Sequence, residues 1–388
     1  MKKKIGIYLL ENKKIGGAWQ INLMMLNALN KLSKEKYQVI IFQEKNIWSR
    51  YASPKIEIIN LKRKIFPKIL TTIISRIIRS KEIISFFSNI LDSHIKKIND
   101  TKCDLIIFPT QDDNSFKVKS KTITTIWDLM HIYEGQFAEY TKKEKARRDR
   151  KYQNICSFCS SIIVESETTK KHIIQNYKVI KKKIKVLPLT YTPYLDKPKK
   201  FDVKKKFNIR KKYIFYPAQF WEQKNHINLI LAFKNVLKKY DIELILSGAK
   251  KINFYKIKSI IKENKLENKV KIINFVHEKY MYSLYKNAEC VAYVSRTGPT
   301  NVPPLEALKV GTPLICSDVY EMKKQVGSKS ALFVNPTKIY EIESSILNIL
   351  KSNTLKKKLI YNGRKRIKNL SLDNFSKNFN DIIKESLI

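Results

Sequence analysis

Residues 290–318 read CVAYVSRTGPTNVPPLEALKVGTPLICSD and contain, in order, a strand, a loop, a helix and a second strand. The run CVAYVS is rich in β-branched residues and predicts the first strand. Pro303 and Pro304 precede LEALKV, and proline is favoured in the first turn of a helix. The apolar run PLICSD predicts the next strand. This succession is typical of a parallel α/β sheet.

The same alternation of short β-branched runs and longer helical stretches continues along the chain. In the first half, the predicted strands are IGIYLL, QVIIFQ, IEIIN, DLIIFPT, TITTIWD, SIIVES and IKVLPL. In the second half, they are YIFYPA, IELILSG, VKIINF, CVAYVS, PLICSD and ALFVNP. We therefore predict an α/β protein with two tandem Rossmann-like domains that face a cleft with the carboxyl ends of their strands.

The stretch TYTPYLDKPKKFDVKKKF lies between the two sets of strands. It is rich in proline and lysine and has no hydrophobic period, which predicts a linker. We accordingly predict an N-terminal domain over residues 1–195 and a C-terminal domain over residues 196–370. A last helix, residues 371–388, can cross back to the N-terminal domain.

The chain is strongly basic. Its 388 residues include 77 Lys and Arg against 34 Asp and Glu, a formal net charge of +43, and 43% of them are hydrophobic, enough for two cores. Such a charge attracts polyanions and anionic surfaces. Codon bias in an AT-rich genome also produces the joint abundance of Lys, Ile and Asn, so the composition leaves both explanations open.

Five cysteines in a chain of this length predict a reducing compartment, and hence a cytoplasmic protein. The apolar run at residues 5–10 is too short for a signal-peptide core, and no run reaches the roughly 18 apolar residues of a membrane span. Cys156 and Cys159 form a CxxC pair, which is compatible with redox or metal chemistry. We favour packing at a helix end, because no second pair accompanies it.

Residues 65–98 form a distinct amphipathic stretch. The apolar residues at helical spacing are Ile65, Ile69, Ile73, Ile77, Ile84, Phe87, Leu91 and Ile95. The basic residues that crowd its beginning are Lys62, Arg63, Lys64, Lys68, Arg76, Arg79 and Lys81. The pattern fits either a core-facing helix pair with a solvated side or a basic face for a membrane surface.

Two loops carry the candidate chemistry. The loop GPTNVPPLE ends at a helix N-terminus, where free N–H groups suit a diphosphate, and Glu306 lies one turn inside the helix. Glu306 could accept hydrogen bonds from sugar hydroxyls, or it could be a solvated acid that favours the helix dipole. The stretch YPAQFWEQKNH places Lys224, Asn225 and His226 after a strand, where one cation can neutralise a phosphate.

Together these residues resemble the retaining glycosyltransferases of family GT4, or group 1, which have the GT-B fold. The resemblance extends over nearly the whole chain. It rests on an early Gly-Gly loop (Gly16, Gly17), WDLMH at 127–131, VESETTKKHI at 164–173, FYPAQFWEQKNH at 215–226 and GPTNVPPLEALKVGTPLICSD at 298–318.

The resemblance implies a role for individual residues. Lys224 would hold the donor diphosphate, and Glu306, as the second glutamate of an E-x7-E motif, would bind the ribose. The other donor-side residues that it implies are Gly16, Gly17, Gln219, Asn225, Gly298, Thr300, Asn301, Val302 and Pro303. Asp128 matches the acid that follows a frequent active-site histidine. His131 is a further acid/base candidate, or else a hydrogen-bonded structural histidine.

Three positions depart from the family pattern. Gly298 stands where the first glutamate of E-x7-E would be, Gln219 where an arginine usually pairs with the lysine, and Trp127 where a histidine usually precedes the acid. We interpret these departures as variation within active enzymes. Asp112 and Asp113 are adjacent and do not form a DxD metal motif, and we expect them in a solvated turn.

The resemblance implies transfer of a hexosyl group from a nucleotide-diphosphate sugar to a glycan or lipid-linked glycan, with retention and without a metal or other cofactor. The expected pathway is surface polysaccharide synthesis, at the inner face of the cytoplasmic membrane and in contact with its anionic surface. No nucleic acid is expected as a partner. The alternatives are a basic nucleic-acid-binding protein, a degenerate GT-B protein, and a phosphorylase or epimerase of this fold.

Overall fold

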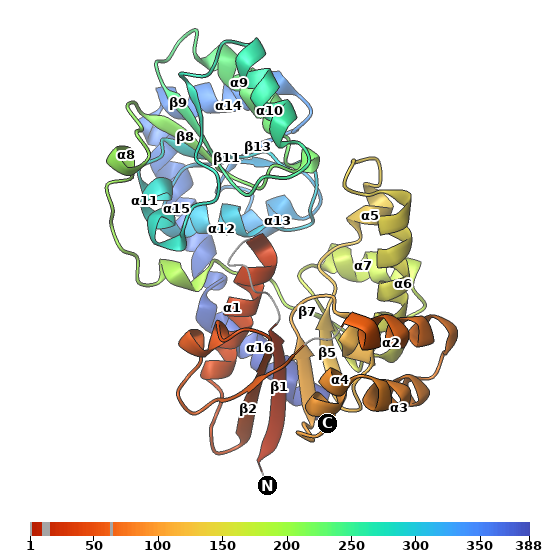
Figure 1. Cartoon of the computed structure of the whole chain (residues 1–388). Coiled ribbons are helices and arrows are strands. Elements are labelled where there is room, and N and C mark those ends of the chain that lie inside the picture. Colours follow the sequence, from red (N-terminus) through yellow and green to blue (C-terminus); the bar gives the residue numbers. More distant parts are fainter. Residues whose placement is uncertain (1, 10–15, 63–64) are drawn as a thin grey trace. The chain divides into compact units, whose positions relative to one another are not determined.

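The computed structural model describes residues 2–9, 16–62 and 65–388 (Figure 1). The chain forms two compact units. Unit 1 comprises Met1–Leu129, Lys142–Pro188 and Leu372–Ile388, and unit 2 comprises Met130–Thr141 and Leu189–Ser371. Each unit is built on a parallel sheet with helices, so the predicted α/β class with two Rossmann-like domains is confirmed.

The described part of unit 1 contains a seven-stranded sheet with the order β3-β2-β1-β4-β5-β6-β7. Its strands are β1 (Lys3–Leu9), β2 (Tyr37–Gln43), β3 (Glu57–Asn60), β4 (Leu105–Phe108), β5 (Lys121–Thr125), β6 (Ser161–Val164) and β7 (Ile184–Val186). Ile5 pairs in parallel with Val39 on one side and Leu105 on the other. All seven strands were predicted, although Leu10 of the first run lies outside the described residues.

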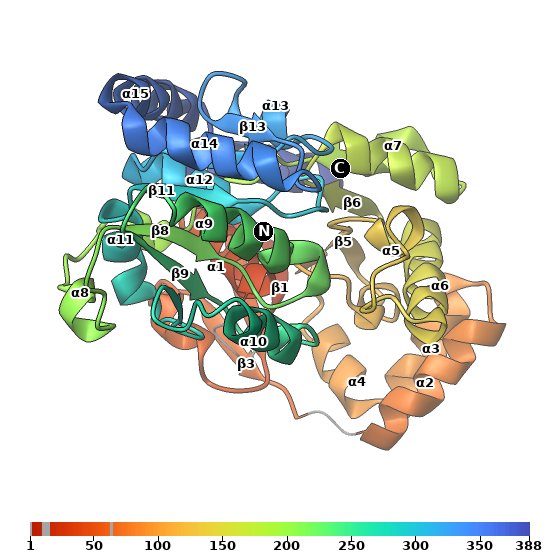
Figure 2. The same ribbon diagram turned by 90° about the horizontal axis from the view of Figure 1, so that it is seen from above.

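Helices flank this sheet. They are α1 (Gly16–Asn30), α2 (Ile65–Ile77), α3 (Lys81–Leu91), α4 (Ser93–Asn99), α6 (Lys142–Phe158), α7 (Glu167–Asn176) and α16 (Leu372–Leu387). The helix α16 packs against α1 and β5, and Lys185 and Glu385 form an ion pair at 2.6 Å. The helices α2, α3 and α4 follow one another side by side (Figure 2).

The described part of unit 2 contains a six-stranded parallel sheet with the order β10-β9-β8-β11-β12-β13. Its strands are β8 (Tyr213–Pro217), β9 (Glu243–Ser247), β10 (Val270–Ile272), β11 (Cys290–Tyr293), β12 (Leu314–Ser317) and β13 (Leu332–Val334). All six strands were predicted. Because β8 and β11 are neighbours, the loops that follow them emerge side by side at the carboxyl edge of the sheet.

Helices cover both faces of the second sheet (Figure 1). One face carries α9 (His226–Val236), α10 (Phe254–Glu263) and α14 (Ile339–Lys351). The other carries α11 (Glu278–Lys286), α12 (Val302–Val310), α13 (Met322–Val326) and α15 (Asn353–Asn369). Unit 2 also contains α5 (Met130–Tyr133), α8 (Val203–Lys206) and a 3-10 turn, η5 (Glu222–Lys224).

The unit boundaries differ from the predicted ones in two places. We predicted the first boundary after residue 195, but residues from Leu189 onward belong to unit 2, because Thr190 donates to the Leu370 carbonyl and Tyr194 to Glu306. Met130–Thr141 also belongs to unit 2. There the backbone N–H of Ala138 donates to the Glu222 carboxylate at 3.3 Å.

The cysteine pair is part of the core of unit 1. Cys156 and Cys159 are free, buried and packed with Ile155 and Ile162. Burial raises the pKa of the Cys156 thiol to about 12, so it stays protonated and unreactive. Among the described residues, no group of His, Cys, Asp and Glu side chains is arranged to hold a metal ion. No helix in the same part of the chain has both the length and the apolar character needed to cross a membrane.

Candidate functional site

The loop between β11 and α12 brings polar side chains to the carboxyl edge of the second sheet. Asn301 is the N-cap residue of α12, and Pro303 lies in the first turn, as predicted. The Asn301 side chain does not cap its own helix. Its Oδ1 atom instead accepts a hydrogen bond from the Tyr293 hydroxyl at 2.7 Å. The backbone N–H of Asn301 donates to Oε1 of Gln325 at 2.9 Å.

Lys224 points at this same cluster from the neighbouring β8 loop. Its Nζ atom lies 3.1 Å from Oδ1 of Asn301, 3.1 Å from the Tyr293 hydroxyl and 3.4 Å from Oγ of Ser295. These three oxygens carry no formal charge and orient the ammonium. The structure therefore places two predicted donor residues, Lys224 and Asn301, in direct contact. Their role as diphosphate ligands stays a prediction.

Gly298, the first departure from the family pattern, has a conformational reason. Its φ angle is +103°, a region that residues with a side chain rarely adopt. A Cβ atom there would lie 3.0 Å from Nδ2 of Asn301. A glutamate at this position would therefore strain the loop that presents Asn301 to Lys224.

Gln219, Asn225 and His226 lie close to Lys224 in the sequence, and each makes different contacts. Oε1 of Gln219 accepts from the Trp221 indole at 3.0 Å. Asn225 has a left-handed backbone, and its Nδ2 donates to the carbonyls of Val294 and Pro336, so it ties two loops together. His226 is buried against two aromatic rings, and burial lowers its pKa to about 3.

Thr300 and Val302 complete the loop. The Thr300 hydroxyl is buried and has no hydrogen-bond partner among the described residues. Val302 is buried at the start of α12.

Glu306 is withdrawn from solvent. It is 5% exposed, and its carboxylate accepts hydrogen bonds from the hydroxyls of Thr192 at 2.5 Å, Tyr194 at 2.8 Å and Tyr285 at 2.6 Å. Burial raises its pKa, and the three donors act in the opposite direction. The interpretation of Glu306 as a solvated acid at the helix start is therefore wrong. A ribose hydroxyl would have to join or replace one of these donors.

Comparisons with known proteins agree with this architecture. Residues 198–366 match the family described as Glycosyl transferases group 1. The chain matches this family model over less than half of its length, within unit 2. It is 27% identical over 193 residues to the O-antigen chain mannosyltransferase RfbU of Salmonella typhimurium, covering 49% of this chain and 51% of that protein. The chain thus spans about half the length of this curated relative.

Two solved structures share the fold of this chain. Sucrose-phosphate synthase from Thermosynechococcus elongatus is 17% identical, with a TM-score of 0.78 over 99% of both chains. Anabaena HepE, solved in complex with UDP-glucose, is 14% identical, with a TM-score of 0.73 over 98% of this chain and 99% of that one. The predicted GT-B fold and the resemblance to group 1 are thereby confirmed.

The remaining predicted residues of the group 1 pattern are divided between the units. Gly16 and Gly17 begin α1 in unit 1, and a Cβ atom on Gly17 would meet no atom within 4 Å. Asp128 follows β5 in unit 1, whereas His131 is buried in α5 of unit 2. The roles of all four residues stay predictions.

Three charged residues of interest were not predicted from the sequence. Glu139 of unit 2 has a raised pKa because of burial and the nearby Glu222 carboxylate, while Lys224 acts in the opposite direction. Glu165 follows β6 in unit 1, is fully buried, and accepts from Thr169 at 2.6 Å. Lys117 is a fully buried cation of unit 1. No periodic pattern marks these residues. For Glu165, the sequence signals are its place directly after a strand and inside the stretch VESETTKKHI.

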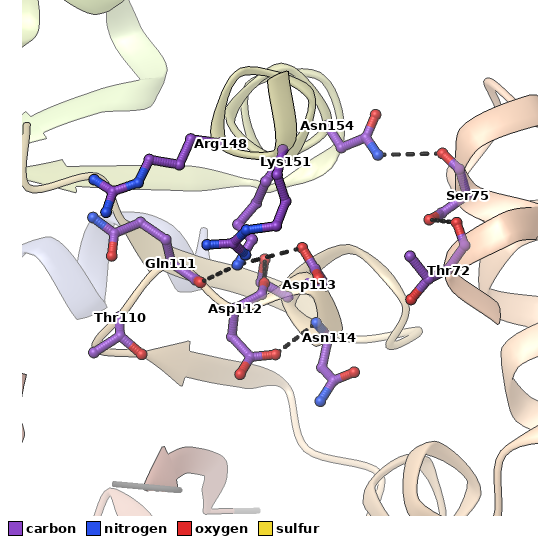
Figure 3. Close-up of polar contacts among 12 residues, drawn as sticks. Thr72, Ser75, Thr110, Gln111, Asp112, Asp113, Asn114, Arg148, Lys151 and Asn154 are labelled. Atoms are coloured by element: carbon purple, nitrogen blue, oxygen red, sulfur yellow. Dashed lines mark hydrogen bonds and ion pairs between the residues drawn. The ribbon is translucent and has the colours of Figure 1, made fainter. Parts of the chain in front are cut away.

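The adjacent aspartates lie in a polar cluster at the end of β4 (Figure 3). Asp112 accepts from the Asn114 N–H at 2.8 Å and so caps a short 3-10 turn, η2 (Asp113–Phe116). Asp113 lies 3.7 Å from the Lys151 ammonium, which also donates to the Gln111 carbonyl at 3.1 Å. The predicted turn is present, but its acids are half-buried and paired with protein groups rather than solvated.

Proposed function

We propose that the protein transfers a hexosyl group from a nucleotide-diphosphate sugar, and that the Lys224 cluster binds the diphosphate of this donor. The observation that carries the proposal is the convergence of Lys224 and Asn301, 3.1 Å apart, at the carboxyl edge of the second sheet and the N-terminus of α12. In open α/β sheets this edge is where ligands bind. An ammonium beside a helix N-terminus suits an anion.

The group 1 family supports this assignment, as does the fold shared with HepE, a protein solved with UDP-glucose. Transfer with retention needs little from side chains if the leaving diphosphate guides the acceptor to the same face of an oxocarbenium-like sugar. The protein then contributes position and charge compensation. This chemistry needs no metal ion when a lysine and helix N–H groups balance the diphosphate charge.

The acceptor that we propose is a glycan or lipid-linked glycan of a surface polysaccharide. Similarity to an O-antigen chain mannosyltransferase over half of the chain supports this class of acceptor. An acceptor of this kind places the enzyme at the inner face of the cytoplasmic membrane. Asp128 and His131 are the residues that we propose for handling the proton of the acceptor hydroxyl.

A donor panel tests the proposal. Purified protein is titrated with UDP, GDP, ADP and TDP by calorimetry, and the corresponding sugar nucleotides are screened for slow hydrolysis. One nucleoside diphosphate should bind, and its sugar nucleotide should be hydrolysed. Salt-dependent binding of generic RNA, without binding of any nucleoside diphosphate, would contradict the proposal and favour a nucleic-acid-binding protein.

A further inference from the structure

The apolar side of α2 faces solvent. Phe66 is 77% exposed, Ile69 54%, Ile73 43% and Ile77 76%. These residues are spaced as one face of a helix. Among the described side chains of the same helix, the buried ones are polar, namely Thr71 and Ser75. The expectation that the apolar side faces the core is therefore wrong for α2. In an ordinary surface helix the apolar side is buried, whereas here it is exposed.

Polar partners inside unit 1 explain this orientation. The fully buried Lys117 ammonium donates to the hydroxyls of Thr71 at 3.0 Å and Thr72 at 3.2 Å. The side chain of Asn154 on α6 donates to the Ser75 carbonyl at 3.2 Å, and Figure 3 shows Thr72 and Ser75 on the side of α2 nearest α6. These contacts require the side of α2 that carries Thr71, Thr72 and Ser75 to face the protein. The isoleucines on the opposite side of the helix therefore face solvent.

The adjoining helix α3 continues the exposed surface. The side chains of Ile83, Phe86, Phe87 and Ile90 are exposed, while Ile84 and Ser88 on the same helix are buried. The helices α2 and α3 pack side by side (Figure 2). The α2–α3 apolar face is then defined as Phe66, Ile69, Ile73, Ile77, Ile83, Phe86, Phe87 and Ile90. Exposed large apolar side chains that gather on two adjoining helices mark a binding site.

The charges around this face decide what it can bind. Lys62, Arg76 and Arg79 are exposed on or next to these two helices, together with one exposed acid, Glu82. Lys81 is not available, because its ammonium donates to the Ser120 carbonyl and burial lowers its pKa. Arg63 and Lys64 lie outside the described residues, as does the Lys68 side chain. A second copy of a chain with net charge +43 would be repelled by such a surface, whereas an anionic lipid layer would be attracted.

We propose that the α2–α3 apolar face docks on an anionic lipid bilayer. The isoleucine and phenylalanine side chains enter the boundary between headgroups and acyl chains, and the flanking cations meet the lipid phosphates. The docking needs neither donor nor acceptor. Only its purpose, access to a lipid-linked acceptor, rests on the proposed function, so either proposal can fail alone.

Vesicle sedimentation tests the surface directly. The wild-type protein should sediment with vesicles of phosphatidylglycerol and phosphatidylcholine, and much less with pure phosphatidylcholine. The triple variant Phe66→Ser, Ile77→Ser, Phe86→Ser should lose about tenfold or more of this binding. The matched control is Ile180→Ser, Ile252→Ser, Tyr255→Ser, which removes equally exposed apolar side chains elsewhere and should bind as the wild type does.

A fluorescent label reports insertion without weakening the face. The five native cysteines are buried, so a thiol-reactive NBD group should label Phe86→Cys selectively. Its emission should shift to the blue when anionic vesicles are added, and a label on Tyr255→Cys in unit 2 should not respond. Three results would overturn the proposal: no vesicle binding by the wild type, equal binding by the triple variant, or a dimer in ultracentrifugation that the triple variant abolishes.

Discussion

Acidic side chains are usually exposed, and large apolar side chains are usually buried. The surroundings of α12 reverse the first of these tendencies, and the α2–α3 apolar face reverses the second. On α12, Glu306 is 5% exposed, whereas Phe66 on α2 is 77% exposed. Removing a charge from water and leaving a large apolar side chain in it both oppose folding. Neither arrangement is therefore expected from folding alone.

The two regions differ in which groups offset the unfavourable free energy of this burial or exposure. Three hydroxyls inside unit 2 donate to Glu306, so part of the burial penalty is offset within the protein. No comparable group covers the exposed residues of α2 and α3 within the described chain. The role of the α12 region can hence be tested by measuring unfolding and nucleotide binding of the protein alone. A test of the α2–α3 apolar face requires a lipid surface.

Glu165 is a second buried acid. Of the changes predicted here, its loss of a proton with rising pH should have the largest effect on the free energy of unfolding. Burial raises its pKa to about 8, from an ordinary value of 4.5. Between these values the folded state keeps a proton that the unfolded chain has lost, so raising the pH favours unfolding. Stability should fall by roughly 3 to 5 kcal/mol over this window.

Urea unfolding at a series of pH values measures this effect. In Glu165→Gln the side chain no longer titrates, so the same series should be flatter by the predicted amount. Equal slopes for wild type and variant would mean that Glu165 is ionised in the folded protein and that its site is more polar than the structure indicates.

Two isoleucines allow a buried apolar helix face to be compared with an exposed one. Like α2, α14 is a 13-residue amphipathic helix, but its Ile346 is fully buried while Ile73 of α2 is 43% exposed. Ile346→Ala should lower the free energy of unfolding by about 2 to 5 kcal/mol, and Ile73→Ala by less than about 0.5 kcal/mol. Urea unfolding of both variants checks this, and a large loss for Ile73→Ala would show that α2 packs inward in solution.

Lys224 tests the polar region by activity rather than by stability. Lys224→Ala should lower kcat/KM for the donor by the equivalent of about 2 to 4 kcal/mol, because a preorganised charge at the diphosphate is lost. The matched control is Lys234→Ala, an exposed lysine on α9. Steady-state kinetics with the donor found by the panel measures both. Unchanged turnover in Lys224→Ala would remove Lys224 from the donor site.

The sequence predicted the strands and part of the site because those signals are local. Each strand is a short run that contains β-branched residues. Lys224 and Asn301 each lie in a loop that follows a strand, and such loops gather at the carboxyl edge of a parallel sheet. The rotation of α2 could not be predicted, because its period defines a stripe but not the direction that the stripe faces. That direction depends on Lys117 and Asn154, which are distant in sequence. The hydroxyls of Thr192 and Tyr285 around Glu306 likewise follow no pattern.

Glu306→Gln should have the smallest effect and decides what the buried acid does. If Glu306 binds the ribose, affinity for the nucleoside diphosphate should fall by roughly 1 to 3 kcal/mol, because one acceptor oxygen is lost. Calorimetry measures the affinity, and urea unfolding measures the stability separately. Tyr285→Phe is the control: it removes one internal donor at 2.6 Å but leaves the carboxylate able to accept from a ligand, so it should affect stability more than affinity. If Glu306→Gln destabilises the fold yet binds the nucleotide unchanged, the acid serves only to join Thr192, Tyr194 and Tyr285 to α12.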